Sequence, residues 1–164
     1  MKPFLIFIGL FLSVFSLADD VKKDVKPEDY LKITSVKAAT IQPGKPGEAI
    51  ITAKVYPGMH VQANPASKPN LIATALTVTS KEGLEVKTPT YPEGKPYRLK
   101  DSSEDISCYE DEFQIRVPIG TGVASKLGKV ELDASLRFQA CNDKTCFFPQ
   151  KREMKIPVQI VVKK

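Results

Sequence analysis

Apolar and polar residues alternate with a period of two along much of this chain, a pattern typical of β-strands with one buried face. The clearest run covers residues 130–140. Its odd-numbered positions are polar, and its even-numbered positions are apolar: Val130, Leu132, Ala134, Leu136, Phe138 and Ala140. We therefore predict a half-buried antiparallel strand here.

Further strands follow from the same alternation or from runs of β-branched residues. They are predicted at residues 31–36, 49–55, 59–63, 74–79, 113–117 and 156–162. In the last of these, alternation from Ile156 through Val158 and Ile160 to Val162 predicts one apolar face. Thirteen prolines and nine glycines interrupt these runs, and no long stretch has a helical period. The fold class predicted is all-β, an immunoglobulin-like antiparallel β-sandwich without the antibody Cys…Trp…Cys pattern, since the chain has no Trp.

One segment departs from the strand pattern. Residues 92–107 are polar and rich in charge, with Gly94 and Pro96 near their start. We predict an irregular loop, and a loop of this length in a compact domain is usually functional or disordered.

The N-terminus has the features of a secretory signal peptide. Lys2 provides a positive start, a run of about a dozen mostly apolar residues follows, and Ser16 and Ala18 are small. The run is too short for a membrane-spanning helix. We predict a cleaved signal peptide at 1–18, a flexible lead-in at 19–29 and one domain at 30–164, exported and not stably inserted in a membrane. An uncleaved anchor is the alternative.

Charge excludes one class of partner. The formal net charge is +5, and the 24 basic residues are interspersed with 19 acidic ones. No basic patch with interleaved aromatic residues is visible, so we expect no nucleic-acid partner. We also expect no cofactor.

Two of the three cysteines, Cys141 and Cys146, flank a four-residue turn directly after the clearest strand. A hairpin of this kind can bring two Cβ atoms within disulfide distance. Closing so small a loop stabilises a fold by only about 2 kcal/mol. A disulfide that contributes little stability is a candidate for redox chemistry, and a structural staple is the alternative.

Residues beside the pair can alter its reactivity, which requires a thiolate. Lys144 would favour the anion and Asp143 would oppose it. Phe147, with Phe148, could shield one sulfur from solvent and raise its pKa.

Other chemistries have less support. A zinc site would need a second pair of ligands, and Cys108 with the lone His60 does not provide it. A hydrolase G-x-S-x-G motif is absent. His60 is interpreted as a structural strand residue. Cys108 has two interpretations: a half-buried free thiol, which we favour, or a resolving or intermolecular thiol.

Several short segments in a fixed order identify a family resemblance. They are Met59-His60-Val61-Gln62-Ala63-Asn64-Pro65, Gly83-Leu84-Glu85-Val86, Tyr91-Pro92, Tyr109-Glu110-Asp111-Glu112-Phe113 before Val117-Pro118, and Phe138-Gln139-Ala140-Cys141 before Cys146 and Pro149. In this order they resemble the periplasmic N-terminal domain of the thiol:disulfide interchange protein DsbD, over residues 30 to 162.

The resemblance implies an immunoglobulin-like fold with its redox pair on a hairpin. It also implies a periplasmic relay that takes electrons from a membrane thiol donor. The recipients would be thioredoxin-fold proteins of the disulfide isomerase or cytochrome c maturation type. Cys146 would form the mixed disulfide with the client, and Cys141 would resolve it. A cap loop would cover the pair, with its counterpart here at 97–101, where Tyr97 is the aromatic lid and Arg98 and Leu99 follow.

Two features depart from the family pattern. Four residues separate the cysteines here, where the best-known members have five. The transmembrane conduit and the C-terminal thioredoxin-like domain are also missing, so we expect a separate electron donor. The alternative function is an exported, non-catalytic immunoglobulin-like binding or scaffold module with a structural disulfide.

Overall fold

The computed structural model describes residues 25–81, 83–122 and 126–162. The predicted signal peptide at 1–18, and the lead-in as far as residue 24, lie outside the described residues. Part of the remaining lead-in is folded, because Pro27–Asp29 form a short 3-10 helix, η1. The guanidinium of Arg152 holds this turn by donating hydrogen bonds to the carbonyls of Pro27 and Glu28, at 3.1 and 2.9 Å. Regular structure therefore begins slightly before residue 30.

Within the described residues the regular elements after η1 are strands. Their bounds are β1 (Leu31–Lys37), β2 (Ala39–Ile41), β3 (Gly47–Val55), β4 (His60–Gln62), β5 (Ala75–Val78), β6 (Leu84–Val86), β7 (Lys95–Tyr97), β8 (Ile106–Tyr109), β9 (Glu112–Thr121), β10 (Gly128–Phe138), β11 (Ala140–Cys141) and β12 (Gln150–Ile160). The all-β prediction is confirmed. Each strand predicted from the sequence overlaps a strand of the structure.

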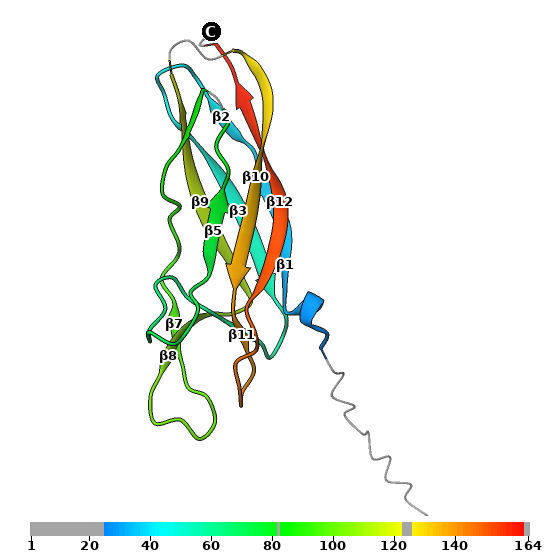
Figure 1. Cartoon of the computed structure of the whole chain (residues 1–164), viewed down its shortest axis with the longest axis vertical. Helices are drawn as coiled ribbons and strands as arrows, with labels where there is room; N and C mark the ends of the chain where they lie inside the picture. Colours follow the sequence, from blue (N-terminus) through cyan, green and yellow to red (C-terminus); the bar gives the residue numbers. More distant parts are fainter. Residues whose placement is uncertain (1–24, 82, 123–125, 163–164) are drawn as a thin grey trace, which may run out of the picture.

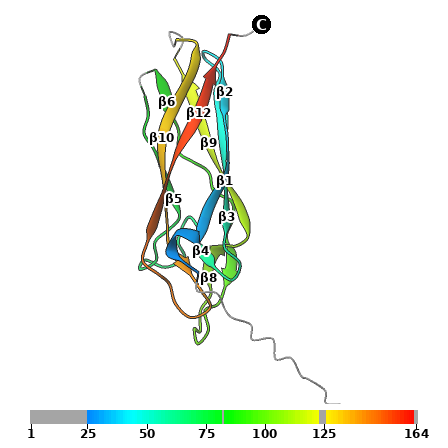
Figure 2. The ribbon, with the colours of Figure 1, turned by 90° about the vertical axis from the view of Figure 1, so that its right-hand side faces the viewer.

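Two sheets form the body of the sandwich (Figures 1 and 2). One has the order β1-β3-β9-β6, and the other has the order β2-β12-β10-β5. Neighbouring strands are antiparallel except β2 and β12, which run parallel. The immunoglobulin-like sandwich expected from the alternating pattern is thus present, with one parallel pair at an edge.

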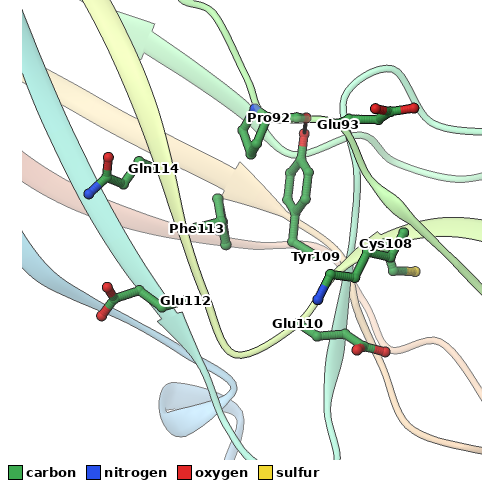
Figure 3. Close-up of a pocket in the computed structure, with 9 residues that line it drawn as sticks. Pro92, Glu93, Cys108, Tyr109, Glu110, Glu112, Phe113 and Gln114 are labelled. Atoms are coloured by element: carbon green, nitrogen blue, oxygen red, sulfur yellow. Dashed lines mark hydrogen bonds between the residues drawn. The ribbon is translucent and has the colours of Figure 1, made fainter.

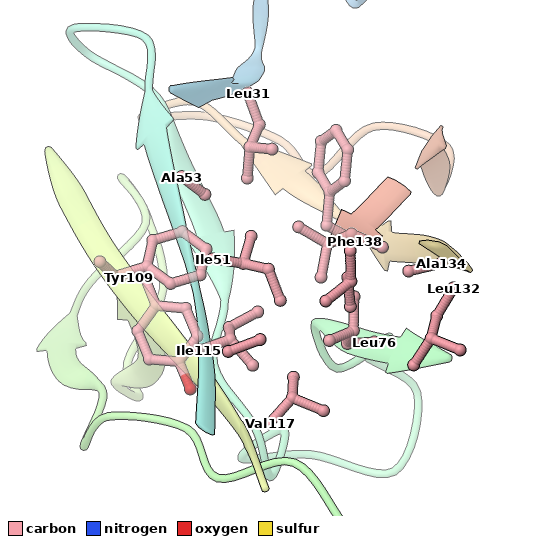
Figure 4. Close-up of a cluster of buried hydrophobic side chains, with 14 of the residues drawn as sticks. Leu31, Ile51, Ala53, Leu76, Tyr109, Ile115, Val117, Leu132, Ala134 and Phe138 are labelled. Carbon is pink, nitrogen blue, oxygen red and sulfur yellow. The ribbon is translucent and has the colours of Figure 1, made fainter. Parts of the chain in front are cut away.

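The core fills the space between these sheets (Figure 4). Ile51 and Ile115 project from the first sheet toward Leu132 and Phe138 of the second, and all four side chains are completely buried. β10 and β12 pair without interruption from Gly128↔Ile160 to Phe138↔Gln150. This continuous register places the even-numbered side chains of β10 inward, as the alternation predicts.

The apolar face predicted for the C-terminal strand ends earlier than expected. Ile156, Val158 and Ile160 are buried, whereas Val162 lies beyond the end of β12 and is 60% exposed. Alternation alone cannot show where a strand loses its partners, and here the pairing with β10 stops at Ile160.

A third, smaller sheet with the order β11-β4-β8-β7 extends one end of the sandwich (Figure 1). It corrects the prediction of an irregular loop at 92–107, because Lys95–Tyr97 forms strand β7 and pairs with β8. β7 has an exposed Pro and no alternation, so its pairing was not visible in the sequence. Only residues 98–105 remain as a loop between the two strands.

No helix long and apolar enough to traverse a bilayer occurs in the part of the chain that the structure describes.

Candidate functional site

Cys141 and Cys146 face each other across a hairpin that extends from the third sheet. The backbone N–H of Phe147 donates to the carbonyl of Ala140 at 2.8 Å, and that of Asn142 donates to Thr145 at 2.9 Å. The cysteines lie between these two hydrogen-bonded pairs, where opposed side chains are closest. Their sulfur atoms are bonded, with an S–S distance of 2.02 Å and a Cα–Cα distance of 3.9 Å.

Asn142 builds the turn between the two cysteines. Its side-chain Oδ1 accepts hydrogen bonds from the backbone N–H groups of Lys144 and Thr145, each at 2.9 Å. Asn commonly stabilises turns in this way, by substituting its side chain for a backbone acceptor. The turn fixes the register that sets the sulfur atoms opposite each other.

The third sheet turns its two faces toward different surroundings. In β4, Val61 pairs with Ala140 and Tyr109, and all three side chains belong to the main core cluster. Since side chains alternate along a strand, the residues flanking Val61 lie on the opposite face. That face carries His60, which is opposite Cys141, and Gln62.

The two cysteines of the disulfide differ in exposure. Cys141 is completely buried, whereas Cys146 is partly exposed. An incoming thiolate must reach the sulfur that it attacks. Cys146 is therefore the member of the pair that another molecule can reach.

Gln62 lies directly against the disulfide. Its side-chain Nε2 donates a hydrogen bond to Cys141 Sγ at 3.2 Å and makes a longer contact with Cys146 Sγ at 3.8 Å. The side chain is completely buried. Its other polar atom, Oε1, has no hydrogen-bond partner among the described residues.

Tyr97 and His60 cover the sheet beside the disulfide. Their rings are stacked with centroids 3.5 Å apart, and His60 Nε2 lies 2.9 Å from the Glu110 carboxylate. Burial raises the pKa of the Tyr97 hydroxyl, and the nearby carboxylates of Asp143 and Glu110 raise it further. The His60 side chain is only 12% exposed. The strand position predicted for His60 is confirmed, and its contacts place it at the site.

The loop after Tyr97 contacts the hairpin through the backbone. The N–H of Lys100 donates to the carbonyl of Asp143 at 2.7 Å. Arg98 points elsewhere and pairs with Asp105 at 2.6 Å in solvent. Leu99 is half-buried, and its carbonyl accepts a hydrogen bond from Ser102. Of the three residues predicted as a cap, Tyr97 is thus the one with a ring contact beside the disulfide.

The side chains expected to tune the thiols occupy different positions. Asp143 and Lys144 are exposed at the hairpin tip. The ring of Phe147 packs against Tyr30, with centroids 4.8 Å apart. Phe148 is 92% exposed, so the idea that it shields a sulfur is wrong. Phe148 lies where the chain leaves the hairpin toward β12, and its ring projects into solvent there.

Cys108 is a free thiol on the same face of the sheet, in register opposite Gln62. It is completely buried, more than the half-burial predicted. Burial raises the pKa of this thiol to about 12, with a smaller effect from the Glu110 carboxylate. A thiol so difficult to ionise is a poor nucleophile, which favours the interpretation of Cys108 as an inert buried residue.

A cavity of about 380 Å³ lies next to Cys108 (Figure 3). Tyr109 projects along it, and its hydroxyl donates to the carbonyl of Pro92 at 3.1 Å. Glu93, Glu110 and Glu112 also line the cavity. These carboxylates disfavour anionic ligands.

Sequence reasoning missed Gln62, Glu110 and Lys100. The available signal for Gln62 was a lone polar residue between Val61 and Ala63 in a predicted strand. Glu110 and Lys100 lie in segments that the family resemblance included, but nothing in the sequence indicated their contacts, because these join segments that are distant along the chain.

Comparisons with known proteins agree with this geometry. A family profile described as "Thiol:disulfide interchange protein DsbD, N-terminal" matches residues 28–157. A search of curated proteins found no match.

Two solved structures share the fold. The DsbD N-terminal domain of Neisseria meningitidis in the reduced form has a TM-score of 0.54 at 15% identity, over 82% of this chain and 90% of that one. The N-terminal periplasmic domain of ScsB from Proteus mirabilis has a TM-score of 0.52 at 13% identity, over 80% of this chain and 48% of that one. At these identities the two structures establish similarity of fold.

Proposed function

The chain belongs to the family of the DsbD N-terminal domain and is a thiol–disulfide exchange module, and we propose that it passes electrons to thioredoxin-fold partners through Cys141 and Cys146. The observation that carries this proposal is the unequal exposure of the two cysteines. A buried Cys141 and an accessible Cys146 divide the two steps of exchange between them.

The exchange proceeds in two displacements. The Cys146 thiolate attacks a sulfur of the client disulfide, forms a mixed disulfide and releases one client thiolate. The Cys141 thiolate then attacks Cys146 Sγ and expels the second client sulfur as a thiolate. The client leaves as a dithiol after gaining two electrons and two protons, and the domain retains the Cys141–Cys146 disulfide.

Tyr97 and the loop that follows it act as a lid in this proposal. The Tyr97 ring stacks on the ring of His60, which is opposite Cys141 in the pairing of β4 with β11. The backbone N–H of Lys100 donates a hydrogen bond to the carbonyl of Asp143 at the hairpin tip. Opening of the lid breaks the Tyr97–His60 ring contact and the Lys100–Asp143 hydrogen bond. An ion pair between Lys68 and Glu104 also ties this loop to the rest of the chain. Arg98 and Leu99 belong to the same loop, but their contacts are with Asp105 and Ser102 and not with the disulfide.

We place the domain in the periplasm, where a disulfide persists until a specific donor reduces it. The family match and the fold shared with a periplasmic domain of ScsB support this location. A membrane thiol protein is the proposed electron donor. Disulfide isomerases and cytochrome c maturation factors are the proposed recipients.

A trapping experiment tests the proposal. Cys141→Ser leaves Cys146 without its resolving thiol, so mixed disulfides with thioredoxin-fold proteins should accumulate in a periplasmic extract. Cys146→Ser is the matched control and should trap none, because the two remaining thiols, Cys108 and Cys141, are both buried. Equal recovery from the two variants, or no adduct from either, would contradict the relay.

The reduction potential separates this function from the scaffold alternative. A structural bridge has a potential below about −300 mV, whereas an exchanging pair lies higher. Equilibration of the wild-type pair with a glutathione buffer measures it. A pair that stays oxidised under every physiological ratio would identify a staple.

A further inference from the structure

Gln62 is a polar side chain buried where apolar ones are expected. It is completely buried in the short strand β4, and its side-chain Nε2 contacts both sulfur atoms of the disulfide. Burying an amide costs free energy unless both of its polar atoms find partners. Here Nε2 contacts sulfur and Oε1 has no partner among the described residues. This arrangement calls for an explanation beyond packing.

The backbone holds Gln62 rigidly in place. Its N–H donates to the carbonyl of Gln139 at 3.0 Å, and its carbonyl accepts hydrogen bonds from Thr74 N and Oγ1 at 3.2 and 2.5 Å. Both neighbouring segments are therefore fixed to β4 on either side of the amide. A rigid backbone keeps the Nε2–H group directed at Cys141 Sγ when the sulfur changes its charge.

We propose that Gln62 is a catalytic residue of the exchange reaction, whose Nε2–H group stabilises the thiolate of Cys141. This inference rests on the proposed function and adds a residue to its chemistry. Cys141 is completely buried, and burial opposes the formation of an anion. A hydrogen bond to a charged sulfur offsets that cost, because such bonds are stronger than those between neutral groups.

The same donor serves both directions of exchange. When a partner thiolate attacks Cys146 Sγ, a new S–S bond forms to the partner and the Cys141–Cys146 bond breaks. The electron pair of the broken bond remains on Cys141 as a thiolate, 3.2 Å from Nε2 if the sulfur keeps its place. In the reverse step that thiolate attacks Cys146 Sγ, and the partner sulfur departs as a thiolate.

The unpartnered Oε1 favours the reduced form as well. Neither sulfur of a disulfide carries a proton, so the oxidised pair offers Oε1 no donor. A thiol S–H is a weak donor that exists only after reduction. Gln62 thus lowers the free energy of the reduced pair relative to the oxidised pair.

The test measures the Cys141 thiol directly. In a Cys108→Ala/Cys146→Ser background Cys141 is the only cysteine, and its ionisation can be followed by the ultraviolet absorbance of the thiolate. Adding Gln62→Met keeps the length and removes both polar atoms, and should raise the Cys141 pKa by about one unit, a tenfold loss of thiolate at a given pH below it. The expected size follows from the strength of a hydrogen bond to a charged group.

Gln139→Met is the matched control. The backbone carbonyl of Gln139 accepts a hydrogen bond from the N–H of Gln62. Its side chain accepts a hydrogen bond from the N–H of Ile72 and donates one to the carbonyl of Phe147. It holds the hairpin without a hydrogen bond to sulfur, so the Cys141 pKa should not change. An equal change in both variants, or no change in either, would overturn the proposal.

Two further measurements keep the test decisive. With all cysteines present, and at a pH where Cys141 of the reduced pair is ionised, Gln62→Met should lower the equilibrium constant for reduction by glutathione about tenfold, equivalent to about 30 mV. In the wild-type protein, the side-chain amide resonance of Gln62 should shift on reduction and titrate with Cys141. An amide signal that changes with neither redox state nor pH would overturn the proposal even if the variant does not fold.

None of these measurements uses a client. Failure of the trapping experiment would therefore leave the inference on Gln62 standing, and failure of the Gln62 measurements would leave the proposed relay intact.

Discussion

The backbone N–H of Lys100 donates a hydrogen bond to the carbonyl of Asp143, joining the loop between β7 and β8 to the tip of the redox hairpin. The two residues are far apart in the sequence: Lys100 lies between β7 and β8, and Asp143 lies in the hairpin that follows β11. This contact, with the Tyr97–His60 stack, holds the loop beside the disulfide. In the proposed lid role of this loop, docking of a partner at Cys146 breaks these two contacts.

Tyr97→Ala should speed reduction of the disulfide by a small dithiol about fivefold. The ring contact with His60 is worth about 1 kcal/mol, and 1.4 kcal/mol corresponds to a tenfold change. Stopped-flow measurement of the reduction rate checks this. Arg98→Ala is the control, because Arg98 pairs with Asp105 in solvent and should leave the rate unchanged. Equal acceleration by both changes would argue against a lid role for the Tyr97 ring.

Phe148→Ser should slow exchange with a thioredoxin-fold partner about tenfold while leaving reduction by a small dithiol unaffected. The ring is 92% exposed two residues from Cys146, and burying such a side chain on docking contributes about 1.5–3 kcal/mol. Leu127→Ser is the control. Leu127 is 55% exposed and directly precedes Gly128, the first residue of β10. Strand β10 begins at the end of the sandwich opposite β11 (Figure 1). A similar loss in both variants would show that Phe148 makes no special contact.

Asn142→Ala should lower the free energy of unfolding by about 1 kcal/mol and weaken disulfide closure, because two backbone N–H groups lose their acceptor. Asn142→Asp keeps an acceptor oxygen at that position and should retain both properties. Urea denaturation and the thiol–disulfide equilibrium with glutathione measure the two effects. Loss of closure in Asn142→Asp as well would point to some other role of the amide.

Reducing the disulfide should cost the fold only about 2 kcal/mol, since the cysteines are five positions apart and close a small loop. The core between the two large sheets does not depend on the bond. Urea denaturation of the oxidised and reduced protein, monitored by circular dichroism, gives the difference. A reduced protein without a cooperative transition would contradict the view that the bond is free to cycle.

Cys108 should make the fold less stable in alkali. Its pKa is raised to about 12 by burial, so above the ordinary thiol pKa the unfolded chain loses a proton that the folded chain retains. Stability is therefore fully present below about pH 9 and falls toward pH 12, by up to about 1.4 kcal/mol per pH unit. Urea denaturation across this range should show the decline in the wild type and less of it in Cys108→Ala. If the stability of the wild type and of Cys108→Ala fell equally with rising pH, the Cys108 thiol would have to be in contact with solvent.

The sequence by itself determined the fold class and the redox pair. Period-two alternation from Val130 to Ala140 predicts a strand with one buried face, because successive side chains point to opposite sides of a sheet. The same local reasoning placed Cys141 and Cys146 across a short turn, since hairpin geometry depends only on residues near in sequence.

Tertiary structure decided everything that depends on segments meeting from a distance. Strand β7 has no pattern of its own and exists through its pairing with β8. Gln62 reaches Cys141 only because β4 pairs with β11, 79 positions along the chain. The unequal burial of Cys141 and Cys146 follows from the same packing. Local propensity carries no information about such contacts, which form only when the whole chain folds.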